Sequence, residues 1–181
     1  MGRKNAFKLE RVSVRLVPDA PLYSDKNINS PADAVHVVGD TLCEMDREVV
    51  CVINVRADGV PINCTFASMG AVNYSMAHPR ELLKASILSN AANIILVHNH
   101  PSGTLVPSVD DVRLTDRMQK LCELMGIPLQ DHIIVGRDNS CYFSFKEKGI
   151  IKPHLPCYQT NYHYMDWEEK EYVSEKGTSG R

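Results

Sequence analysis

The chain has 181 residues, of which 44% are hydrophobic and 23% charged, and its formal net charge is −2. This length suits one domain with a substantial apolar core. The near-neutral charge lacks the basic stripe that binds phosphate backbones, so direct nucleic-acid binding is not favoured. No apolar run approaches the ~20 residues of a membrane helix, and no secretory leader is evident. Six cysteines without a C-x-x-C pair indicate a reduced, cytoplasmic protein.

Residues 1–29 are predicted to form an N-terminal extension. Within it, residues 9–17 alternate apolar and polar side chains, which is the period of a half-buried strand. The folded domain is expected over residues 30–151. Residues 152–181, which hold several tyrosines and a mixed charge run, are expected to form a flexible tail outside the core.

The first predicted helix begins at Ser30 and Pro31, because serine is a favoured N-cap and proline suits the first helical position. Its apolar positions repeat at helical spacing to about Met45. Gly39 within this helix is unfavourable, since glycine costs about 1 kcal/mol relative to alanine in a helix interior.

The rest of the domain alternates between strands and helices. The elements predicted by periodicity and turn residues are a hairpin of strands over 48–56 and 60–68, a helix from Pro79, a buried strand over 94–100, a helix over 108–125 and a last hairpin from 133–135 and 141–145. This order predicts an α/β sandwich.

Two histidines, His98 and His100, end the buried strand. Residues i and i+2 of a strand point to the same face, so both imidazoles can reach one point in space. A carboxylate from the next element, Asp111, would give three ligands for a cation such as Zn²⁺ and leave a fourth position for water. The spacing therefore predicts an open, catalytic metal site and argues against two unrelated histidines.

Ser108 and Asp111 also match a helix-capping box, in which the serine accepts a backbone N–H and the acidic residue suits the helix dipole. The two roles are compatible, because an aspartate in the first turn can still face a metal. Asp110 is the adjacent alternative, but it would face a different direction around the helix.

The segment with His98, His100, Ser108 and Asp111, together with one block before it and one after it, resembles the RadC branch of the JAMM (JAB1/MPN) metallopeptidase family. The resemblance covers roughly residues 30–150, and four blocks in a fixed order are far more specific than one. The blocks are His78-Pro-Arg-Glu81, His98-Asn-His-Pro-Ser-Gly103, Pro107-Ser108-x-x-Asp111 and Asp131-His-Ile-Ile-Val-Gly136. The resemblance implies a cytidine-deaminase-like α/β/α sandwich with a mixed sheet, in a form lacking the N-terminal helix-hairpin-helix segment.

The resemblance also implies roles for the site residues. Asp111 matches the third metal ligand beside His98 and His100. Ser108 matches the residue that hydrogen-bonds the developing oxyanion. Zn²⁺ is the implied ion.

The attacking water needs a proton acceptor, and the resemblance to the JAMM family implies a glutamate at the start of a strand after the first long helix. Glu48 fits this place and is the predicted general base, with an ordinary solvated glutamate as the alternative. Glu44 and Glu81 are the other candidates, although Glu81 in a first helical turn suits a dipole-stabilising role better.

Two further residues are candidates for supporting or substrate-binding roles. His132 could orient a ligand or touch substrate, and a buried histidine bonded to backbone is the alternative. Asn99 points away from its neighbouring histidines on a strand, which favours a structural role over ligation.

The implied function is zinc-dependent hydrolysis of an amide bond, with a protein or peptide as substrate. RadC proteins carry a DNA-repair label, which the charge balance of this chain does not support. The alternative from another class is a non-catalytic or weakly catalytic interaction module that acts with DNA-processing or mobile-element machinery, although the intact ligand set argues against it. A metal-dependent nuclease would need phosphate-binding groups, and only Arg113 and Arg117 lie close in sequence. The oligomeric state stays open.

Overall fold

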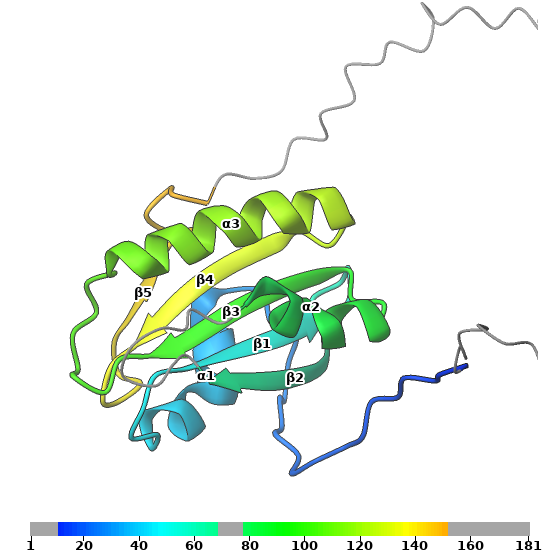
Figure 1. Cartoon of the computed structure of the whole chain (residues 1–181). Coiled ribbons are helices and arrows are strands. Elements are labelled where there is room, and N and C mark those ends of the chain that lie inside the picture. The colour runs from blue at the N-terminus through cyan, green and yellow to red at the C-terminus, as the bar shows by residue number, and fades with distance from the viewer. Residues whose placement is uncertain (1–10, 69–77, 152–181) are drawn as a thin grey trace, which may run out of the picture.

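The computed structural model describes residues 11–68 and 78–151, and its centre is a five-stranded mixed sheet in the order β2-β1-β3-β4-β5 (Figure 1). The elements in chain order are α1 (Pro31–Cys43), β1 (Val49–Val55), β2 (Pro61–Ser68), α2 (Pro79–Leu88), β3 (Asn93–Asn99), α3 (Val109–Met125), β4 (Leu129–Val135) and β5 (Tyr142–Ser144). β3 and β4 pair in parallel, and the other neighbours pair antiparallel. The predicted α/β sandwich with a mixed sheet is confirmed.

The sheet is covered on both faces, with α1 on one side and α2 and α3 on the other (Figure 1). Alternate residues of β1, β3 and β4 enter two separate cores, so these strands are almost continuously apolar. Every residue of β1 is buried. β3 therefore lies in the middle of the molecule, and side chains at its carboxyl end are held between neighbours on both sides.

The helix ends carry the predicted capping residues. The Ser30 hydroxyl accepts a hydrogen bond from Asp33 N, the Asp33 carboxylate accepts one from Ser30 N, and Pro31 is the first helical residue. Gly126 ends α3 in the left-handed conformation with φ 67°, which glycine adopts without strain. In the described ranges, no helix combines the length and hydropathy needed to cross a membrane.

Gly39 lies inside α1 because the turn after β4 packs against it. A Cβ atom at this position would lie 2.9 Å from Asn139 Cβ and 3.1 Å from Val35 Cγ1. The neighbouring Asp40 accepts a hydrogen bond from the Asn139 side chain at 2.6 Å, which holds the turn in place. Close approach of two segments, not helix propensity, therefore selects the glycine.

We predict that Gly39→Ala destabilises the protein, although the same change in an open helix gains about 1 kcal/mol. Overpacking at this contact should cost on the order of 1–3 kcal/mol, measured as a lower Tm. An Asn139→Gly background lacks the nearer colliding atom and keeps only the contact with Val35, so Gly39→Ala should cost less stability there. A loss of equal size in both backgrounds would show that the contact is not the cause.

The strand predicted over residues 9–17 is absent from its described part, residues 11–17, which are extended without pairing to a strand among the described residues. Val12 and Val14 are 78% and 69% exposed. An alternating pattern gives a segment two faces, but a strand also needs a neighbouring edge for its hydrogen bonds. Residues 9 and 10 and the tail predicted over 152–181 lie outside the described residues.

Candidate metal centre

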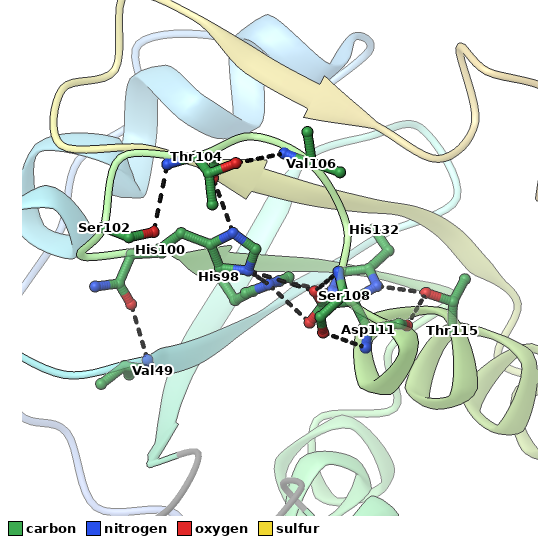
Figure 2. A network of polar contacts seen from close by, with 11 residues as sticks. Val49, His98, His100, Ser102, Thr104, Val106, Ser108, Asp111, Thr115 and His132 are labelled. Carbon is green, nitrogen blue, oxygen red and sulfur yellow. Dashed lines mark hydrogen bonds and ion pairs between the residues drawn. The ribbon is translucent and has the colours of Figure 1, made fainter.

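His98 and His100 from the end of β3 meet Asp111 from the first turn of α3 (Figure 2). The two Nε2 atoms lie 3.0 Å apart, and the Asp111 carboxylate oxygens lie 3.0 Å from His98 Nε2 and 3.4 Å from His100 Nε2. Their side chains are buried, with residue exposures of 0%, 5% and 2%. Two ligands of a tetrahedral zinc with bonds of about 2.0–2.1 Å lie roughly 3.3 Å apart, so the three groups are spaced as ligands of such an ion.

The position of the two histidines follows from the sheet. His98 is paired with Val50 of β1 on one side and with Ile134 of β4 on the other. The backbone N–H of His100 donates to Val135 O at 2.8 Å, which continues the contact with β4 past the end of β3. Backbone hydrogen bonds to both neighbouring strands therefore fix the directions of the imidazoles before any metal binds.

A chain of hydrogen bonds fixes the tautomer of His98. The hydroxyl of Thr115 donates its one proton to Asp111 O at 2.7 Å, so it can only accept from His132 Nδ1, at 2.6 Å. The neutral His132 then accepts at Nε2 from His98 Nδ1, at 2.9 Å. Burial lowers the pKa of His132 well below its usual value, which keeps this ring neutral. His98 therefore carries its proton on Nδ1 and presents the lone pair of Nε2 to the group.

His100 is fixed in the same tautomer by a backbone group. Its Nδ1–H donates to Thr104 O at 2.8 Å, so the neutral ring turns its Nε2 lone pair toward the group, and the protonated ring donates Nε2–H to Asp111. Its hydrogen bond with Asp111 raises the pKa of His100. Burial alone would raise the pKa of Asp111, but the hydrogen bonds of His100 and His98 hold it well below its usual value. The donor set is thus two imidazole nitrogens and a carboxylate, which suits a borderline cation.

Asp111 takes part in the predicted helix cap and also turns its carboxylate toward the two histidines. Ser108 Oγ accepts from Asp111 N at 3.1 Å, and the Asp111 carboxylate accepts from Ser108 N at 2.7 Å. Since Ser108 Oγ is the acceptor in this pair, its hydroxyl proton can be donated elsewhere. The neighbouring Asp110 is exposed and bonds Arg113 at 3.2 Å, away from the histidines. The cap therefore orients the carboxylate that completes the group.

Glu48 directly precedes β1. Val50 is paired with His98 in the antiparallel register, so Glu48 comes next to His100, two positions further along. Its negative charge contributes to raising the pKa of His100. Glu48 is exposed, and its carboxylate can therefore reach solvent at the edge of the buried group.

The two alternative glutamates lie elsewhere. Glu44 is the C-cap of α1, and Glu81 forms an ion pair with Lys84 at 2.6 Å within α2. Glu48, by contrast, is one of the charges that raise the pKa of His100. Of the three candidates, the geometry favours Glu48.

Two groups of this site were not predicted from sequence. Thr115 lies four residues after Asp111, so a search for polar residues one helical turn beyond a ligand could have found it. The carbonyl of Thr104 has no sequence signal, because every residue has a backbone carbonyl.

Asn99 faces away from the two histidines and bonds the backbone that precedes β1.

The loop after β3 is held by residues that follow β4. Arg137 Nε donates to Pro101 O at 3.1 Å, and the stem of Arg137 lies against Gly103, whose φ is 86°. A Cβ at Gly136 would lie 3.2 Å from Gly103 O. The two sequence blocks that end in these glycines thus form one packed unit, which places the Thr104 carbonyl beside His100.

We predict that Gly103→Ala weakens metal binding. The substitution adds strain at a positive φ and pushes the loop from Arg137, whose Cγ would lie 3.3 Å from the new Cβ. The matched control is Gly149→Ala, which has φ 69° and nothing within 4 Å of a Cβ. Both variants should lower Tm, but only Gly103→Ala should lower zinc affinity in a chelator competition. Equal zinc affinities of the two variants would show that the loop around Gly103 does not affect the metal centre.

Comparisons with known proteins agree with this geometry. The family model described as RadC-like JAB domain matches residues 28–150. A UPF0758 protein of Desulfitobacterium hafniense is 40% identical over 154 residues, which cover 83% of this chain and 66% of that protein. A UPF0758 protein of Clostridium kluyveri is 42% identical over 127 residues, covering 70% of this chain and 55% of that protein. The chain thus spans between about half and two thirds of these relatives. It belongs to the RadC-like JAB domain family.

Proposed function

We propose that this chain is a zinc-dependent hydrolase of JAMM type that cleaves an amide bond in a protein or peptide. The supporting observation is the orientation of the two imidazoles. Both Nδ1 atoms are committed as donors, one to His132 and one to Thr104 O, and both Nε2 lone pairs converge with the Asp111 carboxylate. Two imidazole nitrogens and a carboxylate that converge in this way form a donor set that a cation can bind.

The residues around the group have separate chemical tasks. A zinc ion held by His98, His100 and Asp111 would supply Lewis acidity toward a carbonyl and lower the pKa of water. Glu48, beside His100, is placed to accept a proton. The Ser108 hydroxyl, whose oxygen already accepts from the helix backbone, can donate its proton to a developing oxyanion.

The substrate and compartment belong to the proposal. The three candidate ligands are at most 5% exposed, so an amide in an extended segment can approach them more readily than one in a folded surface. Five cysteines of the described residues are free thiols, which suits a reducing compartment such as the cytoplasm.

The first test is the metal content of the purified protein. Wild type should retain about one zinc per chain, and His98→Ala and His100→Ala should lose it. His36→Ala, which removes an exposed histidine of α1, is the matched control and should bind as wild type does. Failure of wild type to retain metal after zinc is supplied would refute the hydrolase and leave the interaction module as the better proposal.

The second test is hydrolysis of peptide and isopeptide libraries by the zinc-loaded protein. Glu48→Gln should keep the metal and lose about 10²–10⁴-fold in rate, the usual contribution of a general base. Glu44→Gln, which changes the glutamate at the end of α1, should leave the rate unchanged. A Glu48→Gln protein as active as wild type would remove Glu48 from the mechanism.

A further inference from the structure

We infer that Asn99 is a positioning residue that sets the direction of Glu48, an inference that rests on the proposed function. Asn99 is 1% exposed and lies between the two candidate histidine ligands, with its side chain on the opposite side of β3. On that side, the side-chain oxygen of Asn99 accepts a hydrogen bond from the backbone of Val49.

The hydrogen bonds of Asn99 enclose Glu48. Asn99 Oδ1 accepts from Val49 N at 2.8 Å, and Asn99 Nδ2 donates to Arg47 O at 2.9 Å. A third, longer contact joins Nδ2 to Met45 O at 3.4 Å. The carbonyl of Arg47 belongs to the peptide unit before Glu48, and the N–H of Val49 belongs to the peptide unit after it. One side chain therefore fixes both peptide planes that flank the Glu48 Cα.

This contact replaces backbone pairing where the sheet ends. The pairing of β1 with β3 begins at Val50 and His98, so Glu48 lies beyond it. The residues before Glu48 form a turn and bend after α1, with Arg47 exposed and bonded to the adjacent Asp46. Among the described residues, the Asn99 amide is the tie from this turn to β3. The amide carries an acceptor and a donor in one plane. It can therefore bond the N–H of Val49 and the C=O of Arg47, which lie on either side of Glu48, at the same time.

The three residues 98–100 at the end of β3 then have different roles. His98 and His100 point to one face and supply imidazoles, while Asn99 points to the other and holds the backbone of the general base. His98 and Asn99 end the central strand, and His100 follows directly with its N–H bonded to Val135 O, so the sheet sets the distance between base and candidate ligands.

The first measurement is hydrogen exchange of the Val49 amide in the metal-free protein. Asn99→Ala should speed this exchange by about tenfold or more relative to the amide of Ile53, deeper in β1. Asn54→Ala is the matched control, because Asn54 is also fully buried in β1 and bonds Asn63 at 2.7 Å. Unchanged Val49 exchange in Asn99→Ala would overturn the inference.

If Asn99→Ala fails to fold, Asn99→Asp serves instead. Its carboxylate keeps the acceptor for Val49 N but faces the Arg47 carbonyl with an oxygen in place of a donor. The peptide unit before Glu48 should then be released while the one after it stays held. The carbonyl ¹³C shift of Arg47 reports the lost hydrogen bond, and a shift that stays at its wild-type value would overturn the inference.

The second measurement is a double-mutant cycle on the active enzyme. Asn99→Ala should keep zinc content and KM and lower kcat by about tenfold or more, yet cost nothing further in Glu48→Gln. A further loss in that background would assign Asn99 a role independent of Glu48 and refute the inference. If wild type hydrolyses nothing, the proposed function fails. Exchange of the Val49 amide still decides whether Asn99 holds the backbone on both sides of Glu48.

Discussion

Asp111→Asn should empty the metal centre while α3 stays capped. The amide oxygen of asparagine can still accept from Ser108 N, where the carboxylate now accepts at 2.7 Å. The charge that faces His98 and His100 at 3.0 and 3.4 Å is lost, and a neutral amide is a poor zinc ligand. Because loss of outer partners alone costs about 10–100-fold in affinity, loss of this ligand should cost more than about 100-fold. Chelator competition measures the difference.

Ser108→Ala is the matched variant with the opposite pattern. It removes the Oγ that accepts from Asp111 N and should cost about 0.5–2 kcal/mol of stability, as N-cap losses do. The carboxylate remains, so zinc should still bind. In the active enzyme, loss of an oxyanion donor should lower kcat by about 10²–10³-fold. Zinc retained in Asp111→Asn, or lost in Ser108→Ala, would contradict the division between ligand and cap.

The metal-free Asp111→Asn protein should also respond less to acid. The pKa of Asp111 is held below its usual value, so its carboxylate stabilises the fold at neutral pH. That stabilisation is complete above the unfolded pKa of about 3.9 and is lost as pH falls toward the lower folded value. Urea unfolding from pH 5 to pH 3, below the raised pKa of His100, should show a shallower loss of stability in the variant than in the metal-free wild type. An identical slope would mean that the carboxylate is not stabilised by its histidine partners.

The sequence predicts the ligand group well because local geometry defines it. A period of two places His98 and His100 on one face, and a capping pattern places Asp111 at the start of a helix. Glu48 is harder, since its distance to His100 depends on how β1 pairs with β3, and only the resemblance to a family suggested it. The Thr104 carbonyl lies beyond sequence analysis, because the packing of Arg137 on Gly103 selects which carbonyl meets the imidazole.

The same distinction explains the one error in the predicted elements. The alternation over residues 9–17 is a local signal, whose described part forms no strand. Pairing is a long-range property, and the described structure offers residues 11–17 no strand edge. By contrast, the runs over 48–56 and 60–68 were joined by a turn that brings their edges together, so their pairing was predictable.

Thr115→Val should weaken zinc binding by about 10–100-fold, although Thr115 touches none of the metal-binding atoms. Valine keeps the shape but removes the hydroxyl that accepts from His132 Nδ1. With no acceptor at Nδ1, the buried and neutral His132 is better placed with its proton on Nε2. That proton would meet His98 Nδ1 at 2.9 Å and force His98 to carry its own proton on Nε2, the atom that ligation needs. The variant therefore changes a tautomer and not a contact.

His132→Leu tests the same chain of hydrogen bonds from its middle. It leaves the buried Nδ1–H of His98 without an acceptor, which should cost about 1–3 kcal/mol of stability in addition to zinc affinity. The ring of Phe145, stacked on His132 with centroids 4.9 Å apart, would also lose its partner. Thr41→Val, a half-buried threonine of α1, is the control for the threonine change and should bind zinc normally. If Thr115→Val binds zinc as tightly as wild type, the proton on His98 is not set through His132. The orientation of Nε2 would then come from the strand alone, and His132 would be a core residue that happens to contact a ligand.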